Sequence, residues 1–472
     1  MSREKTVLKN TLIMMFGTFL PRVINLLTTP IINGSISGSA YGNVELITNT
    51  ILNFAVPLLT LQMEQALFRF LIDSKDELEQ KKVITNGYAV IIFMMMIGAL
   101  ITLFLPIEGF SGGWKALLIG YIVIEIIATT SRFILRAFSK YKEYSILAGI
   151  VVFVNFGCVV LNMKVFHMGM QGVVLALTVA DIVGFLYVIK VTNVFSYIDL
   201  KCYDKDYRNS MMRYALPFLP NQISWYINQM SDRWIISLFL GFFSNGVYSM
   251  ANKIPSIVNI LYPAFNLAWT DSAQRSVNDE DSFSYYNNMF KKLFCIISAG
   301  TGLLIGLTPI IFAVLCANPK LYVALPYSVL LVVATYFYCF GQFFGSIYVA
   351  LKQTKNMSVT TMISAIINIV INLVFMYQFG VIIACISTFC ANLFLAGYRY
   401  YDLNKRYLKI KLPSRLIVLT IFVFAILCVC CLSSSIYIKI GGMVLSFIYA
   451  WFIAGDLAIS MVKGLINRKK GN

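Results

Sequence analysis

Long apolar runs recur from one end of the chain to the other, and they constrain the fold more than any motif does. A helix needs about 20 consecutive apolar residues to cross a bilayer. Runs of this length are bounded at 10–32, 41–69, 83–106, 115–137, 144–163, 171–190, 212–240, 246–270, 291–315, 326–350, 357–378, 380–400, 414–433 and 436–460. The sequence therefore predicts an all-α polytopic membrane protein with fourteen transmembrane helices.

The composition agrees with this interpretation. The chain is 59% hydrophobic and only 12% charged, whereas a soluble domain carries about 25% charged residues and is less than half apolar. The first run lacks a small-residue cleavage site, so we expect an uncleaved first helix rather than a signal peptide. The longest connections, at 191–211, 271–290 and 401–413, leave little room for a separate catalytic domain.

The net charge of +17 would suit a nucleic-acid partner, but the distribution of the charge indicates otherwise. If the loops alternate sides from a cytoplasmic N-terminus, most of the 38 Lys and Arg residues fall on one side of the membrane. This bias is the positive-inside rule. We therefore expect both termini in the cytoplasm and no nucleic-acid partner.

Four of the predicted spans carry polar side chains at helical spacing, which places these side chains on one face of each helix. The stripe of the first span consists of Thr18, Arg22, Asn25 and Thr29, and that of the second consists of Glu45, Asn49, Asn53, Thr60 and Glu64. The seventh span has two adjacent stripes, one of Asn221, Trp225, Asn228 and Asp232 and one of Gln222, Tyr226, Gln229 and Arg233. The stripe of the eighth span consists of Asn252, Ser256, Asn259 and Asn266, with Ser249 and Lys253 alongside. We expect these four helices to face water or each other.

The first and second spans resemble the seventh and eighth. A Leu-Pro pair precedes each stripe, at Leu20-Pro21 and Leu219-Pro220, and a glycine-flanked turn follows it. We expect two pseudo-symmetric six-helix lobes, at 1–195 and 196–405, followed by two additional helices and a basic tail at 406–472. Such a repeat, with a polar site at its interface, is typical of alternating-access transporters.

Three cations, Arg22, Arg233 and Lys253, lie deep inside predicted spans, away from the span ends. A charged residue at the bilayer centre costs roughly 2.5–3.5 kcal/mol on insertion scales, so such residues usually face a cavity or a partner. The functional interpretation is a cationic cavity for a strongly anionic ligand such as a pyrophosphate, which Arg binds in bidentate fashion. The alternative is that Asp232 neutralises Arg233 or Lys253 and only joins the seventh helix to the eighth.

Polar and aromatic side chains near these cations are candidates for contacts with a sugar. The candidates for hydrogen bonding and stacking are Asn25, Gln222, Trp225, Gln229, Asn252 and Asn266, and the further aromatic candidates are Tyr226, Trp234 and Trp269. Tryptophans near membrane boundaries are commonly belt residues, but Trp225 lies inside its span.

Four acids are candidates for binding a coupling ion, either a proton or sodium: Glu64, Glu125, Asp181 and Asp232. Each has an alternative role. Glu64 is equally suited to an ion pair with Arg69, and Glu125 and Asp181 to a buried, protonated and packed state. The ten cysteines lie mostly in spans and suit packing, so we expect neither a metal site nor a cofactor.

The stretch SDRWIISLFLGFFSNGVYSMANKIPSIVNILYPAFNLAWTDSA, residues 231–273, resembles Wzx-type bacterial oligosaccharide flippases of the multidrug/oligosaccharidyl-lipid/polysaccharide exporter superfamily. The preceding ALPFLPNQISWYI and the fourteen predicted helices extend the resemblance. It implies a non-enzymatic, V-shaped transporter of the bacterial cytoplasmic membrane, with a central cationic cavity. Arg22, Arg233 and Lys253 match positions where cavity cations are expected.

The resemblance also implies a substrate and partners. The substrate would be an undecaprenyl-pyrophosphate-linked oligosaccharide, flipped by alternating access for a surface polysaccharide such as O-antigen or capsule. The partners would be this lipid-linked oligosaccharide, membrane lipid, a coupling ion and polysaccharide assembly proteins. One alternative is an ion-coupled drug antiporter of the same superfamily, which would favour an acidic cavity. A second alternative, a membrane glycosyltransferase or polymerase, should show a sizeable outer loop or soluble domain, and the sequence shows neither.

Overall fold

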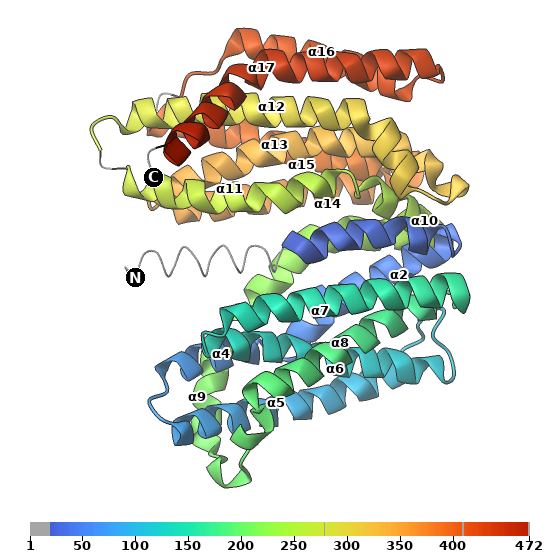
Figure 1. Cartoon of the computed structure of the whole chain (residues 1–472), viewed down its shortest axis with the longest axis vertical. Helices are drawn as coiled ribbons and strands as arrows, with labels where there is room; N and C mark the ends of the chain where they lie inside the picture. Colours follow the sequence, from blue (N-terminus) through green and yellow to red (C-terminus); the bar gives the residue numbers. More distant parts are fainter. Residues whose placement is uncertain (1–18, 278, 408–409, 471–472) are drawn as a thin grey trace. The chain divides into compact units, whose positions relative to one another are not determined.

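The structure, a computed structural model, describes residues 19–277, 279–407 and 410–470, except for some side chains in α10, α14 and α17. Every regular element in these ranges is a helix (Figure 1). The chain forms two compact units. The first ends at Trp234 and also includes Gly241–Gly246, and the second comprises Ile235–Leu240 and the chain from Val247 onward.

The first unit begins with a helix at residues 19–33 and ends within α10 (Phe218–Ala251), which both units share. Its other elements are α2 (Gly38–Thr50), the π-helix η1 (Ile51–Ala55), α3 (Val56–Leu59), α4 (Met63–Asp73), α5 (Glu77–Phe104), α6 (Trp114–Ala137), α7 (Tyr141–Val160), the π-helix η2 (Leu161–Val165), α8 (Met170–Thr192), the 3₁₀ helices η3 (Val194–Tyr197) and η4 (Leu200–Cys202), and α9 (Lys205–Ala215).

The second unit continues from α10 to the C-terminal helix. Its elements are α11 (Pro255–Arg275), α12 (Ser282–Leu315), the 3₁₀ helix η5 (Pro319–Ala324), α13 (Leu325–Ala350), α14 (Thr354–Phe379), α15 (Ile382–Arg406), α16 (Ser414–Leu432) and α17 (Ile436–Lys470).

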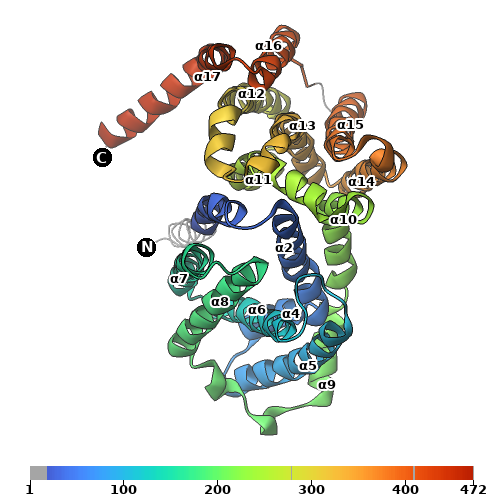
Figure 2. The same ribbon diagram turned by 90° about the vertical axis from the view of Figure 1, so that its right-hand side faces the viewer.

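The helices of the two units pack in the same order. In the first unit α6 packs against α4, α5 and α8, and α8 also packs against α7. In the second unit α13 packs against α11, α12 and α15, and α15 also packs against α14. The additional helices α16 and α17 pack against each other and against α12 (Figure 2). The predicted fold class, two pseudo-symmetric helical lobes with two further helices, is confirmed.

Most of the predicted spans are present as single helices. Among the described residues, eleven helices are long and apolar enough to cross a membrane, and the bent pair Gly38–Leu59 and Met63–Asp73 makes twelve. The two other predicted spans correspond to the helix at 19–33, whose predicted start lies outside the described residues, and to α11. The predicted count of fourteen is compatible with this structure, and the chain is a multi-pass membrane protein.

The second predicted span is broken rather than continuous. Pro57, which lacks a backbone donor, follows η1, and the helix stops after Leu59. Leu61 and Gln62 then adopt left-handed conformations, with φ of 52° and 58°, which are uncommon for non-glycine residues. The axis bends by 58° between the two segments. Glu64, in the first turn of α4, therefore lies directly after the break.

Glycines allow α2 to approach the segment Gly241–Gly246 at backbone distance. Gly241 itself has a φ of 80° and divides α10 into two helices. A Cβ added to Gly42 would lie 1.9 Å from the carbonyl oxygen of Phe242, and one added to Gly246 would lie 2.3 Å from that of Gly38. The Asn245 Nδ2 donates to the Gly42 carbonyl at 2.7 Å. Only glycine permits so close a crossing.

A wholly buried arginine joins three helices of the second unit. Arg399 on α15 donates to the carbonyls of Gly341 on α13 and Met357 on α14, at 2.7 and 3.0 Å. It also donates to the hydroxyls of Thr360 and Thr361, at 2.9 and 2.8 Å. These bonds satisfy the planar fork of the guanidinium, which a buried arginine requires.

Candidate substrate-binding site

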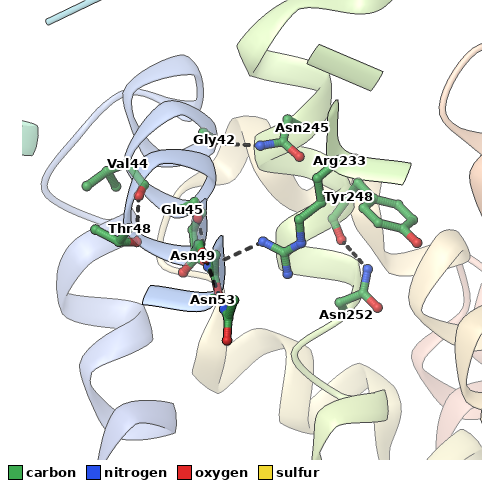
Figure 3. Close-up of polar contacts among 10 residues, drawn as sticks. All are labelled: Gly42, Val44, Glu45, Thr48, Asn49, Asn53, Arg233, Asn245, Tyr248 and Asn252. Carbon is green, nitrogen blue, oxygen red and sulfur yellow. Dashed lines mark hydrogen bonds and ion pairs between the residues drawn. The ribbon is translucent and has the colours of Figure 1, made fainter. Parts of the chain in front are cut away.

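Arg233 and Glu45 form an ion pair inside the first unit. Arg233 lies on α10 and extends toward the polar face of α2, where its Nη1 lies 3.4 Å from Glu45 Oε2 (Figure 3). The side chains are 16% and 18% exposed, so both charges are largely removed from solvent. The attraction within such a pair is largely offset by the cost of removing both charges from water, so the pair adds little net stability.

The face of α2 that meets Arg233 is formed by residues one turn apart. Asn49 donates through Nδ2 to the Glu45 carbonyl at 2.7 Å and lies 3.4 Å from Glu45 Oε2. Asn53, one turn later, donates to the Asn49 carbonyl at 2.9 Å. Asn53 lies within the π-helix η1. Short π-helical turns inside α-helices are rare, and they are frequent at functional sites.

Further contacts fix the register of α10 against α2 and η1. Gln222 Nε2 donates to the Asn53 carbonyl at 3.3 Å. Tyr226 donates to the Thr50 hydroxyl at 3.0 Å and accepts a bond from the Trp234 indole at 2.6 Å. Several polar contacts along α10 therefore hold this helix against α2 and η1.

This arrangement suits the binding of an anion. A guanidinium has five N–H donors in a planar fork, and carboxylate and phosphate groups accept from it in pairs. The Glu45 carboxylate occupies one side of that fork at a distance longer than the usual 2.7–2.9 Å of a charged hydrogen bond. A phosphate group would compete with Glu45 for the same donors.

The other candidates from the first unit differ in exposure. Arg22 and Asn25 are exposed on the helix at 19–33, and Gln229 is exposed on α10. Asp232 is half-buried beside Arg233. The side chain of Trp225 lies outside the described part of the structure.

The candidates from the second unit divide into two groups. Lys253 is half-buried between the end of α10 and the start of α11, and Asn252 donates to the Tyr248 carbonyl one turn earlier at 3.0 Å. Asn266 instead accepts a bond from Ser346 on α13, at 3.3 Å, so its amide takes part in helix packing.

Trp269 is a core residue, and the expectation that it stacks on a sugar is wrong. It is 2% exposed, and its ring lies parallel to that of Phe343, with centroids 4.5 Å apart. Its indole N–H donates to the Phe343 carbonyl at 3.1 Å. The indole and its polar group are both satisfied within the α11–α13 interface, as buried tryptophans require.

The acidic candidates lie in different surroundings. Arg69 pairs with Asp73 at 3.1 Å, on the exposed surface, and not with Glu64 as the sequence allowed. Glu64 is buried, and its Oε2 has no hydrogen-bond partner among the described residues. Glu125 on α6 is buried and pairs with Arg132 on the same helix. Asp181 is buried on α8, which packs against α6.

Two features were not expected from the sequence. The sequence placed Glu45 in the polar stripe of the second span but did not predict its pairing with Arg233. Glu45 lies one turn after Gly42, so its nearness to α10 could be predicted once the glycine crossing is known. Arg399 was not recognised as a buried residue because it lies at the end of a predicted span, where an arginine ordinarily reaches the membrane surface.

Two helical lobes, a discontinuous membrane helix and charged groups inside the spans define a membrane transporter fold. A family model described as "Polysaccharide biosynthesis protein" matches residues 7–270, which is more than half of the chain. The chain therefore belongs to the polysaccharide biosynthesis protein family. A sequence search of curated proteins finds no match.

Solved structures with similar folds are transporters and flippases. The lipid II flippase MurJ in an inward closed conformation is 17% identical, with a TM-score of 0.67, and the match covers 95% of this chain and 100% of that chain. An inward-facing multidrug resistance MATE family transporter of the MOP superfamily is 14% identical, with a TM-score of 0.67 and coverage of 82% and 94%. A MOP superfamily transporter from Pyrococcus furiosus, with a binding pocket described as of reverse polarity, is 14% identical, with a TM-score of 0.53 and coverage of 85% and 96%. The fold is that of this superfamily.

Proposed function

We propose that this protein flips an undecaprenyl-pyrophosphate-linked oligosaccharide across the bacterial cytoplasmic membrane, for assembly of a surface polysaccharide such as O-antigen or capsule. The family supplies the process, polysaccharide biosynthesis. The similarity of fold to a lipid II flippase makes a lipid-linked substrate reasonable. The observation that carries the proposal is the guanidinium of Arg233, held by Glu45 within a span and facing the polar stripe of α2.

The chemistry of the substrate fits these residues. A pyrophosphate carries several acceptor oxygens and would displace Glu45 from part of the Arg233 fork, because bidentate phosphate binding is stronger than a single long contact. Arg22 and Lys253 are proposed to neutralise the remaining charge. Asn25, Gln222, Gln229 and Asn252 are the proposed polar contacts of the oligosaccharide. The polyprenyl chain would stay in the lipid while the lobes alternate access.

The balance of charge favours this proposal over the drug-antiporter alternative. A cationic drug requires an acidic site, whereas the predicted spans of this chain contain the three cations Arg22, Arg233 and Lys253, each within a polar stripe. The match to a multidrug transporter concerns the fold, at 14% identity, and does not favour the antiporter. The proposed partners are the lipid-linked oligosaccharide, the surrounding lipid, a coupling ion and polysaccharide assembly proteins.

The proposal is tested by deleting the gene in its host. Lipid-linked repeat units should then accumulate in the cytoplasmic leaflet, where a membrane-impermeant sugar-specific probe added to intact cells does not reach them. The wild-type gene should restore their appearance in the outer leaflet. Unchanged labelling of these units from outside in the deletion strain would refute the proposal.

A further inference from the structure

Arg136 lies in the last turn of α6, where its guanidinium is held over two aromatic rings. The Cζ atom lies 5.0 Å from the centroid of the Phe68 ring on α4 and 5.3 Å from that of the Phe133 ring on α6. The two rings themselves meet edge to face, with their centroids 6.3 Å apart. A ring attracts a cation that lies within about 6 Å of its centroid. The two rings therefore fix the guanidinium at the α4–α6 interface.

The guanidinium of Arg136 has no acceptor within the described part of the chain. Its Nε is buried without a hydrogen-bond partner. Nη1 and Nη2 also lack a partner, but they are not buried and so reach the surface. The other arginines of the described ranges that are buried or half-buried all have acceptors: Arg132, Arg208, Arg233 and Arg399. Because a guanidinium carries five donors and no acceptor, we expect Arg136 to meet an acceptor from outside the protein.

The chain around Arg136 is basic. Residues 132–143 include four cations and one acid, Glu143. Arg132 has its own carboxylate partner, and Lys140 donates to a backbone carbonyl in the last turn of α8, at 2.7 Å. The positive-inside pattern predicts that this end of α6 faces the cytoplasm, at the depth of the lipid headgroups. A headgroup phosphate is therefore the anion that can reach Arg136.

The matching interface of the second unit is built differently. There α11 packs against α13, as α4 packs against α6 in the first unit. The rings of Trp269 and Phe343 lie parallel with their centroids 4.5 Å apart, and the Trp269 N–H has its own acceptor. This interface is thus closed by ring against ring. A guanidinium over the rings is therefore not a packing requirement that the two units share.

We infer that Arg136, supported by Phe68 and Phe133, binds the phosphate group of a membrane lipid at the end of the first unit. Nη1 and Nη2 donate to two oxygens of the phosphate, in the paired geometry that a guanidinium favours. The rings are half-buried and leave apolar surface beside the lipid chains. Two lipids supply this chemistry, an anionic phospholipid and the proposed pyrophosphate-linked substrate. The inference does not rest on the proposed function, because a resident phospholipid is sufficient to fill the site.

Native mass spectrometry of the purified full-length protein, titrated with phosphatidylglycerol, tests the site. Arg136→Gln should raise the Kd of the tightest-bound lipid by at least about tenfold, as expected for the loss of a charged hydrogen bond. Arg136→Lys keeps the charge but not the paired donors, so it should weaken binding as well. Phe133→Leu keeps the charge and an apolar side chain, and loss of the ring should weaken binding about two- to fivefold.

Arg69→Gln is the matched control, because it removes an exposed arginine from α4, next to Phe68 in the sequence. It changes the net charge as Arg136→Gln does, and it should leave the Kd unchanged. Phosphatidylglycerol should also raise the thermal midpoint of the wild type and of Arg69→Gln, but not that of Arg136→Gln. An arginine that only stabilises the end of α6 and packs on the rings predicts a lower midpoint without lipid and an unchanged Kd.

Three outcomes would overturn the inference. These are equal weakening by Arg69→Gln and Arg136→Gln, which would indicate general charge attraction, an unchanged Kd in both Arg136 variants, and inorganic phosphate that binds as tightly as the lipid. If neither Arg136 variant folds, Phe133→Leu decides the matter, since an unaltered Kd in that variant would contradict the role of the rings.

Competition identifies which lipid occupies the site. Undecaprenyl pyrophosphate that displaces phosphatidylglycerol from the wild type, and binds only weakly to Arg136→Gln, would assign the site to the pyrophosphate lipid. Phosphatidylglycerol that stays bound in its presence would assign the site to a phospholipid, and either result supports the inference. Unchanged labelling from outside in the deletion strain would contradict the proposed function alone, because the binding measurement does not depend on flipping.

Discussion

Arg233 Nη1 lies 3.4 Å from Glu45 Oε2, and this contact joins α10 to the polar face of α2 within the first unit. The pair explains how a chain keeps an arginine within a membrane span, because an acid on the neighbouring helix offsets the cost of burying it. Because the contact with Glu45 is long, Arg233 can still donate hydrogen bonds to a stronger acceptor. The same contact would be expected of a purely structural ion pair.

Removing both members of the pair distinguishes binding from structural support. Arg233→Ala should lower flipping of lipid-linked repeat units by at least about tenfold, because loss of a charged bidentate contact is worth about 1.5–3 kcal/mol. The double variant Arg233→Ala/Glu45→Gln should stay equally inactive, since the anion-binding donors are absent from both. Recovery of flipping in the double variant would mean that Arg233 serves only to neutralise Glu45.

The glycine crossing should not tolerate a methyl group. Gly42→Ala would place a Cβ 1.9 Å from a backbone oxygen, which cannot move as a flexible side chain can. We expect a loss of about 1–3 kcal/mol or more, typical of overpacking, seen as a lower thermal midpoint in detergent. Gly120→Ala on α6 is the matched control, since no atom lies within 4 Å of its added Cβ. Equal stability of the two variants would contradict the close crossing.

Much of the fold follows from the length and polarity of the apolar runs, which locate the helices and separate the two repeats. The break at Leu61 and Gln62 does not follow, because no glycine marks these left-handed residues and Pro57 alone predicts a kink rather than a 58° bend. The local sequence pattern shows which residues of a helix are apolar. It does not show which tertiary contacts compensate a strained backbone.

The sequence likewise predicted some features of the candidate site and not others. Helical spacing correctly placed Glu45, Asn49 and Asn53 on one face of α2 and the η1 that continues it. It did not pair Glu45 with Arg233, because pairing depends on how two distant helices cross. Nearness in the sequence to the candidate amides made Trp269 a candidate for stacking on a sugar, whereas its partner Phe343 lies on α13 and comes from a separate part of the sequence.

The segment after α8 should respond to acid through Asp204. Lys82 donates to Asp204 Oδ2 at 2.6 Å, and this hydrogen bond holds the pKa of the Asp204 carboxyl below its ordinary value. The folded state therefore gains stability above the ordinary pKa of about 3.9, and this gain is lost as the pH falls through the lowered value.

The variant Asp204→Asn tests that effect because an amide keeps the oxygen that caps α9 but loses the charge. The thermal midpoint of the wild type should exceed that of the variant at neutral pH, and the difference should shrink as the pH falls below about 4. Asp206→Asn, an exposed neighbour in the first turn of α9, is the control. A difference between wild type and Asp204→Asn that does not change with pH would exclude the Lys82 pair as its cause.

The buried guanidinium of Arg399 should not be replaceable by an ammonium group. Arg399→Lys keeps the charge but cannot reproduce four bonds to α13 and α14 from one planar fork. Each charged hydrogen bond that is not replaced costs about 1.5–3 kcal/mol, so the thermal midpoint should fall markedly. Arg406→Lys, on the same helix with a half-exposed side chain, should change stability by less than about 0.5 kcal/mol. Comparable effects of the two changes would contradict a clamp specific to Arg399.

The most direct test is to measure in which leaflet the lipid-linked repeat units reside when Arg233 is changed. In the deletion strain, Arg233→Ala should reach the membrane in normal amounts and yet leave these units inaccessible to an impermeant sugar probe. Arg69→Ala, which removes an exposed arginine paired with Asp73, should restore labelling to the wild-type level. Wild-type labelling in cells that carry Arg233→Ala would contradict the proposal that this arginine binds the substrate during flipping.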